Sequence, residues 1–254
     1  MTPRLSLFTA GAAHHGHAEQ VAMHRSQAWK IIVGLDTPIG FTTPGGAGRG
    51  RVVVVPPYVA QSMCHPGHAV MFLAEPGSAR APFALGARAI ELVTGRAADR
   101  LVAIAREAAA LDHADDPAAT TAAFDELGLA GPPIDRRVRR ALDALARRPD
   151  LAISEVAAAL HLSDVHLRHL AHRGTGMPLR SHRLWHRMLH GLTEVMRGAE
   201  LARAAATAGF ADQPHFGRAV RAFLGRTPSS IAAARVLAPW ALREGAALEI
   251  AAMR

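Results

Sequence analysis

The feature that most constrains this chain is a pattern of residues that occurs twice in its C-terminal half. In the first copy, Ala157 is followed after three residues by the sequence HLS at 161–163. In the second copy, Ala205 is followed after three residues by the sequence GFAD at 209–212. The copies are 48 residues apart before the turn and 49 after it, so the second turn is one residue longer. Each copy then continues with a histidine and a large apolar residue, His166-Leu167 and His215-Phe216. Such a repeat predicts one supersecondary unit built twice.

The positions in the repeat suit two short helices joined by a tight turn. Ala157 and Ala205 are small enough for two helices to approach each other closely at a steep angle. Gly209 suits a backbone with positive φ, a conformation that His161 at the equivalent place tolerates less easily. The pattern therefore predicts a helix-turn-helix arrangement in each copy.

The residues after each turn predict where the second helix begins and how it is anchored. Ser163 and Asp212 are strong N-caps. Leu162 and Phe210 are expected to fill the corner between the paired helices. The apolar residues that would hold each second helix to the core are Leu167 and Leu170 in one copy, and Phe216 and Val220 in the other.

The rest of the C-terminal half also predicts helices. Apolar residues from Ile134 to Leu145 follow a 4, 4, 3 spacing, which gives one apolar stripe with arginine on the other face. This helix is expected to end at 147–149, where the sequence is Arg-Arg-Pro. Further helices are predicted at 154–160, 164–172, 179–197, 200–208 and 212–224. The sequence GLAGPP at 128–133 predicts a linker before them.

The sequence pattern of the N-terminal region predicts β structure. Short apolar stretches at 5–8, 29–35, 51–55 and 70–73 are separated by Gly and Pro turns, which predicts a small sandwich or barrel. Residues 87–128 become rich in Ala, Leu and charged residues and predict two or three helices, with Gly95 as one break. The expected fold class is α+β. The expected divisions are a sensor domain at 1–85, a helical connector at 86–132, a helical domain at 133–235 and a helical tail at 236–254.

Charge is distributed unevenly along the chain. Residues 1–132 contain 10 Lys and Arg against 11 Asp and Glu, whereas residues 133–235 contain 17 Arg against 8 acidic residues. An Arg-rich proteome would explain the choice of Arg over Lys, but not its concentration in one half. A basic half joined to a neutral half indicates that one part of the molecule binds a polyanion.

On these residues, positions 134–231 resemble the DNA-binding domain of the AraC/XylS family of transcription regulators. The most specific stretch is GFADQPHFGRAVRAFLGRTP, at 209–228. The first copy fits through Ala157, Leu160, Ser163, Leu167, Leu170 and Gly176, and Leu184-Trp185 and Arg187 match the start of the connecting helix. The chain departs from the family pattern at Ala171, His169, Val220, Leu224 and Ile231-Ala232.

The resemblance implies that the second helix of each pair lies in the DNA major groove, so that one chain covers roughly ~20 bp. It implies base contacts from Val165, Arg168 and His169 in the first copy, and from Gln213, His215 and Arg218 in the second. The same free faces present His166, and Arg173 and Arg221 are placed further along, where phosphate contacts are expected. The alternative is that these arginines are only solvated side chains on exposed faces of a helical interaction protein that binds no DNA.

The N-terminal half resembles, more weakly, a small cupin-type sensor barrel, through 24–38, 52–63 and 71–78. His24, Trp29 and Gln61 are the candidates for lining a small-molecule effector pocket, and ordinary barrel filling is the alternative for each. The set of metal-binding residues that cupin enzymes use is incomplete in this chain. A histidine cluster near a terminus, such as His14, His15 and His17, is more often solvated than bound to a metal. We therefore expect no metal, no cofactor and no enzymatic activity; the alternative is a metal-dependent cupin enzyme with an accessory helical domain.

Composition limits the expected cellular location of the protein and the partners that it can bind. The single cysteine, Cys64, permits no internal disulfide and favours a reducing compartment, so a cytoplasmic location is expected. Apolar runs are too short for a membrane span. The expected partners are double-stranded promoter DNA, a small-molecule effector, RNA polymerase if the protein activates transcription, and a second copy in a homodimer.

Overall fold

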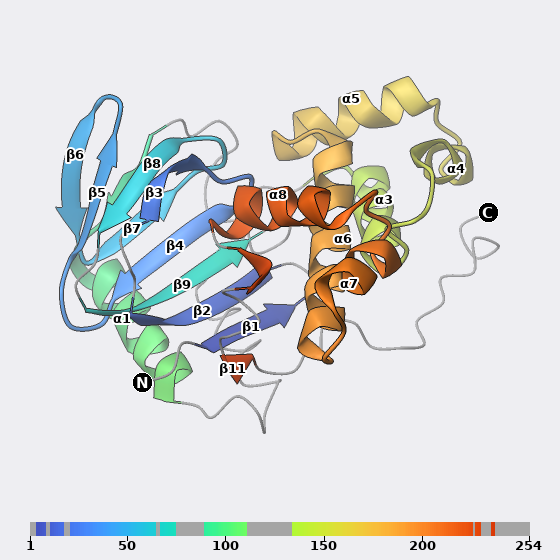
Figure 1. Cartoon of the computed structure of the whole chain (residues 1–254). Coiled ribbons are helices and arrows are strands. Elements are labelled where there is room, and N and C mark those ends of the chain that lie inside the picture. Colours follow the sequence, from blue (N-terminus) through green and yellow to red (C-terminus); the bar gives the residue numbers. More distant parts are fainter. Residues whose placement is uncertain are drawn as a thin grey trace.

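The computed structural model describes residues 4–8, 11–17, 21–64, 67–74, 89–110, 134–225, 227–229 and 235–236. Within these residues a β-rich N-terminal region lies beside a helical C-terminal region (Figure 1). The expected linker at 128–133, Ile231-Ala232 and nearly all of the tail lie outside the described residues. The side chains of His14, His15 and His17 also lie outside them, although their backbone belongs to a strand.

The N-terminal region contains two sheets. The large sheet has the order β10-β7-β4-β9-β2-β1-β11, and the small sheet has the order β3-β8-β5-β6. All neighbours are antiparallel except β1 and β11, which pair in parallel. The strands are β1 (Arg4–Phe8), β2 (Gly11–His17), β3 (Val21–Arg25), β4 (Trp29–Gly34), β5 (Ile39–Thr43), β6 (Gly46–Gly50), β7 (Val52–Val55), β8 (Ala60–Cys64), β9 (His68–Ala74), β10 (Glu91–Val93) and β11 (Arg235–Val236).

The central strands β4 and β7 are buried on both faces, because α1 covers one side of the large sheet and the small sheet covers the other. In β7, Val52 and Val54 pack against helix α1 (Gly95–Ala110), whereas Val53 and Val55 face the small sheet. This double burial explains the nearly uninterrupted apolar sequences of β4 and β7. The expected β-rich N-terminal domain is confirmed, in the form of two packed sheets.

The segment expected to be a helical connector is partly sheet. Residues 91–93 form β10, which pairs with β7 in the large sheet. The helix that follows, α1, begins at Gly95, where φ is +63°, and Leu101, Val102 and Ile104 bury it against the sheet. The described part of this segment therefore extends and covers the large sheet.

The C-terminal region contains six described helices close to their predicted ranges. They are α3 (Arg136–Arg147), α4 (Ile153–Ala159), α5 (Asp164–Thr175), α6 (Leu179–Met196), α7 (Leu201–Thr207) and α8 (Gln213–Leu224). The first four contribute to one core around Leu145 and Leu167, and α6 to α8 form a second core around Trp185 and Phe216. The long helix α6 therefore belongs to both cores and connects the two helix pairs.

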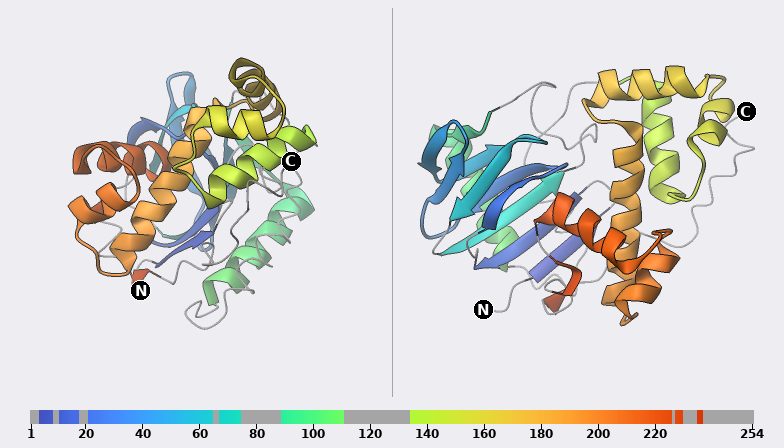
Figure 2. Two further views of the ribbon diagram at one scale, coloured as in Figure 1. Left: turned by 90° about the vertical axis from the view of Figure 1, so that its right-hand side faces the viewer. Right: turned by 45° about the horizontal axis from the view of Figure 1, so that its top comes forward.

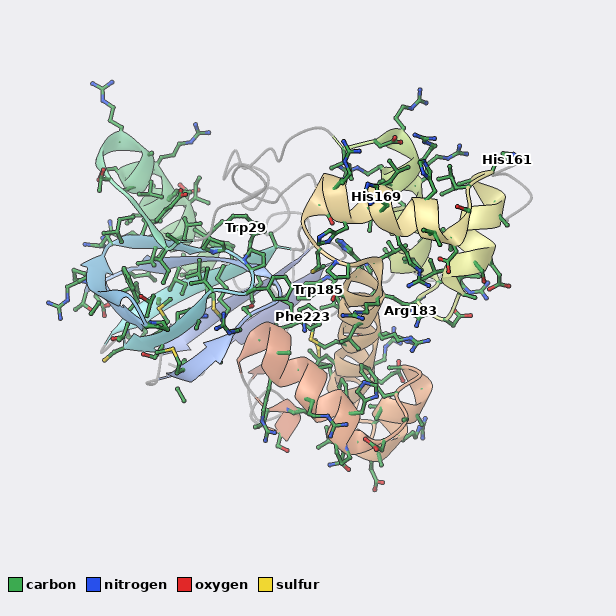
Figure 3. The ribbon with its side chains drawn as sticks, turned by 90° about the horizontal axis from the view of Figure 1, so that it is seen from above. Trp29, His161, His169, Arg183, Trp185 and Phe223 are labelled. Carbon is green, nitrogen blue, oxygen red and sulfur yellow. The ribbon has the colours of Figure 1, made fainter. Side chains whose placement is uncertain are left out.

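The N-terminal sheets pack directly on the second of these cores. Ala28 and Leu73, both fully buried, join the cluster that contains Trp185 and Phe223. The rings of Trp185 and Phe223 meet edge to face, with centroids 5.1 Å apart, and Figure 3 shows both beside the sheets. Two further views show α8 extending from the helical region to the sheets (Figure 2). The second helix pair is thus the part that contacts the N-terminal sheets.

Candidate DNA interface

The two turns of the repeated pattern have matching backbone conformations. Gly209 has φ +74°, as its identity predicts, and His161 at the equivalent place has φ +55°. The amides at the two positions make the same kind of bond to the end of the preceding helix: His161 N donates to Ala158 O and Gly209 N donates to Ala206 O, both at 3.0 Å. The predicted helix-turn-helix geometry is therefore present twice, with one turn closed by a residue other than glycine.

The second helix of each pair, α5 or α8, is here called a reading helix. Both begin at the predicted N-caps. The Ser163 hydroxyl accepts a hydrogen bond from His166 N, and the Asp212 carboxylate accepts one from His215 N. Both end at a glycine with positive φ, Gly176 or Gly225. These caps satisfy backbone groups that a helix leaves unpaired at its ends, and so they fix the length of each reading helix.

Each reading helix is anchored on one side only. Leu167 is fully buried on α5, and Phe216 and Val220 are fully buried on α8. Phe210 fills the corner of the second pair and lies 5.2 Å from the Phe216 ring. Gly191 of α6 permits this packing, because a Cβ atom there would lie 2.7 Å from the Phe216 ring. The opposite side of each reading helix is left facing solvent.

Arg187 of α6 ties the two helix pairs together. Its guanidinium donates to Pro149 O, ahead of α4, at 3.1 Å and to Gly209 O, in the second turn, at 3.3 Å. Burial lowers its pKa, the nearby charge of Arg183 lowers it further, and Asp150 opposes both effects. An arginine held in this way links the loop before α4 to the turn of the second helix pair. Its match to the family's connecting helix was noted in the sequence, but this role was not predicted.

The predicted contact residues of α5 lie on its solvent face. Val165 is 77% exposed, which is unusual for a large aliphatic side chain. The other four are also exposed: His166, Arg168, His169 and Arg173. Figure 3 shows His169 on the outer side of α5.

One of the α5 residues is engaged within its own helix. Arg168 forms a two-pronged ion pair with Asp164 one turn earlier, at 2.9 and 3.0 Å. Both side chains are substantially exposed, so the pair is weak and can open. The bond holds the guanidinium extended along the first turn of the reading helix.

The predicted contact residues of α8 fall into two groups. Gln213, Arg218 and Arg221 are exposed. His215 is only partly exposed, because its ring stacks edge to face on Phe210 with centroids 5.1 Å apart. His215 therefore has less freedom than the other three, and its ring is held close to the turn.

The predicted effector residues do not all meet. His24 Nε2 lies 3.4 Å from Gln61 Nε2, so β3 and β8 bring these two together. Trp29 points to the other face of β4 and packs in the core beneath α1. Its direction follows from strand alternation, since Lys30 and Ile32 occupy the opposite face.

Lys30 joins His24 and Gln61 and was missed in the sequence. Its Nζ lies 2.7 Å from His24 Nε2, and the side chain is buried. His24 Nδ1 lies 2.9 Å from Ala22 O, which makes Nδ1 the protonated nitrogen and Nε2 the acceptor. Burial lowers the pKa of Lys30 to about 7. Burial, and then the charge of Lys30, lower the pKa of His24. A signal was available, because Lys30 is the only lysine in the chain and lies within the apolar sequence WKIIVG.

The described residues offer little to a metal-dependent enzyme. They contain no group of three or more His, Cys, Asp and Glu side chains arranged to hold a metal ion. The alternative of a cupin enzyme gains no support. No described helix is both long and apolar enough to span a bilayer.

Comparison with known proteins agrees with this geometry. A family model described as a helix-turn-helix domain matches residues 156–234. Among solved structures, fatty-acid-bound ToxT from Vibrio cholerae is 11% identical, with a TM-score of 0.54 over 88% of this chain and 95% of ToxT. An apo form of ToxT is 10% identical, with a TM-score of 0.52 over 88% and 97%.

Two further comparisons complete this picture. The C-terminal domain of AraT from Geobacillus stearothermophilus is 20% identical, with a TM-score of 0.37, over 43% of this chain and 93% of that domain. No curated protein matches the chain. The likeness to ToxT shows that both chains share a two-domain fold. Residues 156–234 belong to a helix-turn-helix domain.

Proposed function

We propose that this protein binds a specific promoter sequence by placing α5 and α8 in two successive major grooves on one face of the duplex. The observation that carries this proposal is that both reading helices are capped, anchored on one side and basic on the side left exposed. A helix-turn-helix reads bases with the N-terminal half of its second helix. The exposed residues lie in that half or follow it directly.

The side chains divide by chemistry into base contacts and phosphate contacts. An arginine can bond guanine O6 and N7 together, and glutamine can bond adenine N6 and N7, which suits Arg168, Arg218 and Gln213 to base edges. Val165 suits a thymine methyl group, and His166, His169 and His215 lie within the same half. Arg173 and Arg221 lie a turn or more further along, where a phosphate is nearer than a base.

The test begins with binding-site selection, in which the full chain enriches sequences from a random duplex library. Arg218→Ala should then lose about ten- to a hundred-fold in affinity for the selected site and relax the preference at one base pair. Arg221→Ala, the matched arginine of the same helix, should weaken all sequences similarly and reduce the salt slope by about 1. An unchanged base preference in Arg218→Ala, or no sequence preference in the wild type, would contradict the proposal.

We also propose that the N-terminal domain binds an acidic small molecule at His24, Lys30 and Gln61. The buried amine of Lys30 lies 2.7 Å from His24 Nε2, and the Gln61 amide nitrogen lies 3.4 Å from the same atom. A carboxylate would supply the negative charge that a buried ammonium requires. One solved form of ToxT holds an unsaturated fatty acid, which belongs to this chemical class.

Calorimetric titration tests the effector with a fatty acid and its methyl ester as a matched pair. An unsaturated fatty acid should bind the wild type, whereas the ester and the Lys30→Met variant should show binding at least ten-fold weaker. Equal binding of acid and ester would exclude a carboxylate contact at Lys30.

The remaining expectations stand as proposals of the same kind. The protein acts by binding and not by catalysis, in the cytoplasm, and contacts RNA polymerase if it activates transcription. A homodimer would place two such readers on adjacent sites. The functional divisions are the sensor at 1–85, the connector at 86–132, the DNA-binding domain at 133–235 and the tail at 236–254. Sedimentation of the chain with and without a selected duplex gives the stoichiometry.

A further inference from the structure

The sensor domain supplies the C-terminal cap of the second reading helix. The last carbonyls of a helix have no partner within the helix and need one from elsewhere. At the end of α8, Gln27 N donates to Ala222 O at 3.1 Å, and the Ser26 hydroxyl donates to Phe223 O at 3.0 Å. Both donors belong to the turn between β3 and β4, so a segment 197 residues earlier in the chain completes this helix.

This cap is buried and tightly fitted. Ser26 is fully buried, and its oxygen also accepts a hydrogen bond from Ala28 N at 3.2 Å, so the hydroxyl fixes the turn as well as the helix end. A Cβ atom on Gly225, at the end of α8, would lie only 3.0 Å from His24 Nε2. Ala28, directly after the turn, is buried against the cluster of Trp185 and Phe223. The turn therefore holds the end of α8 by contacts on several sides.

Both reading helices end with a glycine amide that bonds back into the helix: Gly176 N donates to His172 O at 2.8 Å, and Gly225 N donates to Arg221 O at 2.9 Å. The additional donor differs, because at the end of α5 it is the Thr175 hydroxyl of the helix itself, which donates to Ala171 O at 2.8 Å. The same hydroxyl lies 3.0 Å from His182 Nε2 of α6. Each of these partners belongs to the helical region itself. Of the two reading helices, α8 is thus the one whose end is completed by the sensor.

We infer that Ser26 is a positioning residue for DNA recognition, which sets the placement of α8 relative to α5 and with it the half-site spacing that the protein prefers. This inference rests on the proposed function. Two reading helices on a rigid connector accept only duplexes whose half-sites match their separation. The connector α6 fixes the overall separation of the two helices, and the anchor at Ser26 sets the position of α8 within the narrow range that this connection leaves.

The same turn lies between the residues of the proposed effector site. Ser26 follows His24 by two residues, and Lys30 follows Ala28 by two. A change in the distance between His24 and Lys30 must therefore move the turn, and the turn is bonded to the end of α8. The chain thus contains a direct mechanical path from the sensor to one reading helix.

The experiment measures affinity for duplexes in which the spacing between the two selected half-sites is changed by one base pair in either direction. The wild type should prefer one spacing. Ser26→Ala removes the donor to Phe223 O. The ratio of the affinity for the best spacing to the affinity for an altered spacing should then fall by about three- to ten-fold. Preferences for individual bases within each half-site should not change. Ser62→Ala, in β8, is the matched control and should keep the wild-type profile.

The spacing profile separates positioning from stability. A variant that merely unfolds in part loses affinity for every spacing by the same factor, so a uniform loss would overturn the inference, as would an unchanged profile. Ser26→Cys keeps a side-chain donor that is weaker and slightly larger than the hydroxyl, and it should give an intermediate profile if Ser26→Ala fails to fold. A wild type with no preferred spacing would contradict the two-groove function itself, whereas a wild-type preference that Ser26→Ala and Ser26→Cys both keep would contradict only the role of Ser26.

Discussion

His161 and Gly209 show what one residue contributes at the tightest point of the fold. Both adopt positive φ at equivalent places in the two turns, but only glycine does so without a steric penalty. His161→Gly should therefore stabilise the protein by about 0.5–1 kcal/mol, since the relief of strain exceeds the added freedom of the unfolded chain. Gly209→Ala should lower stability by about 1 kcal/mol, because alanine is strained at positive φ. No clash adds to this cost, since the nearest side-chain atoms, those of Arg187, are at ordinary contact distance from the new Cβ atom. Urea unfolding of the two variants gives the signs, and a loss in both would show that His161 contributes through its side chain.

Lys30 makes the stability of the protein depend on pH. Its pKa is about 7 in the folded chain and 10.5 when exposed, so between these values the unfolded chain binds more protons and stability rises with pH. The rise from pH 7 to pH 9.5 should be about 3 kcal/mol, because each unit of pKa difference corresponds to about 1.4 kcal/mol. Lys30→Met should be more stable than the wild type at pH 7 and should show little of this rise. Urea unfolding at the two pH values measures both effects, and equal pH profiles would contradict the burial of a titrating amine.

At the scale of elements, the reading helices depend on their caps. Asp212 accepts the bond from His215 N that begins α8, and Gln213 is the first residue of this helix. Asp212→Ala should lower stability by about 1 kcal/mol and weaken DNA binding beyond that loss, because the first turn frays. Asp212→Asn keeps an acceptor and is the matched control. If Asp212→Ala binds as well as Asp212→Asn, the first turn of α8 does not contribute to recognition.

The helices could be predicted from the sequence far better than the strands. Caps such as Ser163 and Asp212, and the regular apolar stripe from Ile134 to Leu145, are local signals, and they located α3 to α8 within a few residues. Four strands were found because apolar runs mark them. The other strands were missed, and β2, β5 and β6 show why: sequences such as GAAHHGH, IGFTT and GAGRG depend on pairing with other strands and show no local apolar run.

The parts of the candidate site also differ in how well the sequence predicts them. The exposed faces of α5 and α8 followed from helical periodicity, because knowing which side is buried leaves the other side for a ligand. The cluster of His24, Lys30 and Gln61 comes from three strands, and only the sheet register brings them together. The turn at Ser26 could not be predicted to reach α8, since nothing local marks a contact between residues nearly two hundred positions apart.

At the scale of the whole molecule, α6 sets a fixed distance between the two readers. It has 18 residues and belongs to both helical cores, and its Arg187 bonds the loop before α4 and the turn of the second helix pair. Inserting five base pairs between the half-sites turns the second groove to the opposite face, so affinity should fall to that of a single half-site. Inserting a full turn of about ten base pairs restores the face but not the distance, and should not restore affinity. Recovery with the full-turn insertion would show that the two readers are flexibly joined.

Strand β11, which follows the helical region, pairs in parallel with β1 at the edge of the large N-terminal sheet. Arg4 pairs with Arg235 and Leu5 with Val236, so a strand after the last reading helix lies along the edge formed by the first strand of the sensor. Pulling the sensor and the helices apart must break this seam together with the bonds at Ser26. The two halves should consequently melt as one unit, giving a single calorimetric peak whose van't Hoff and measured enthalpies agree.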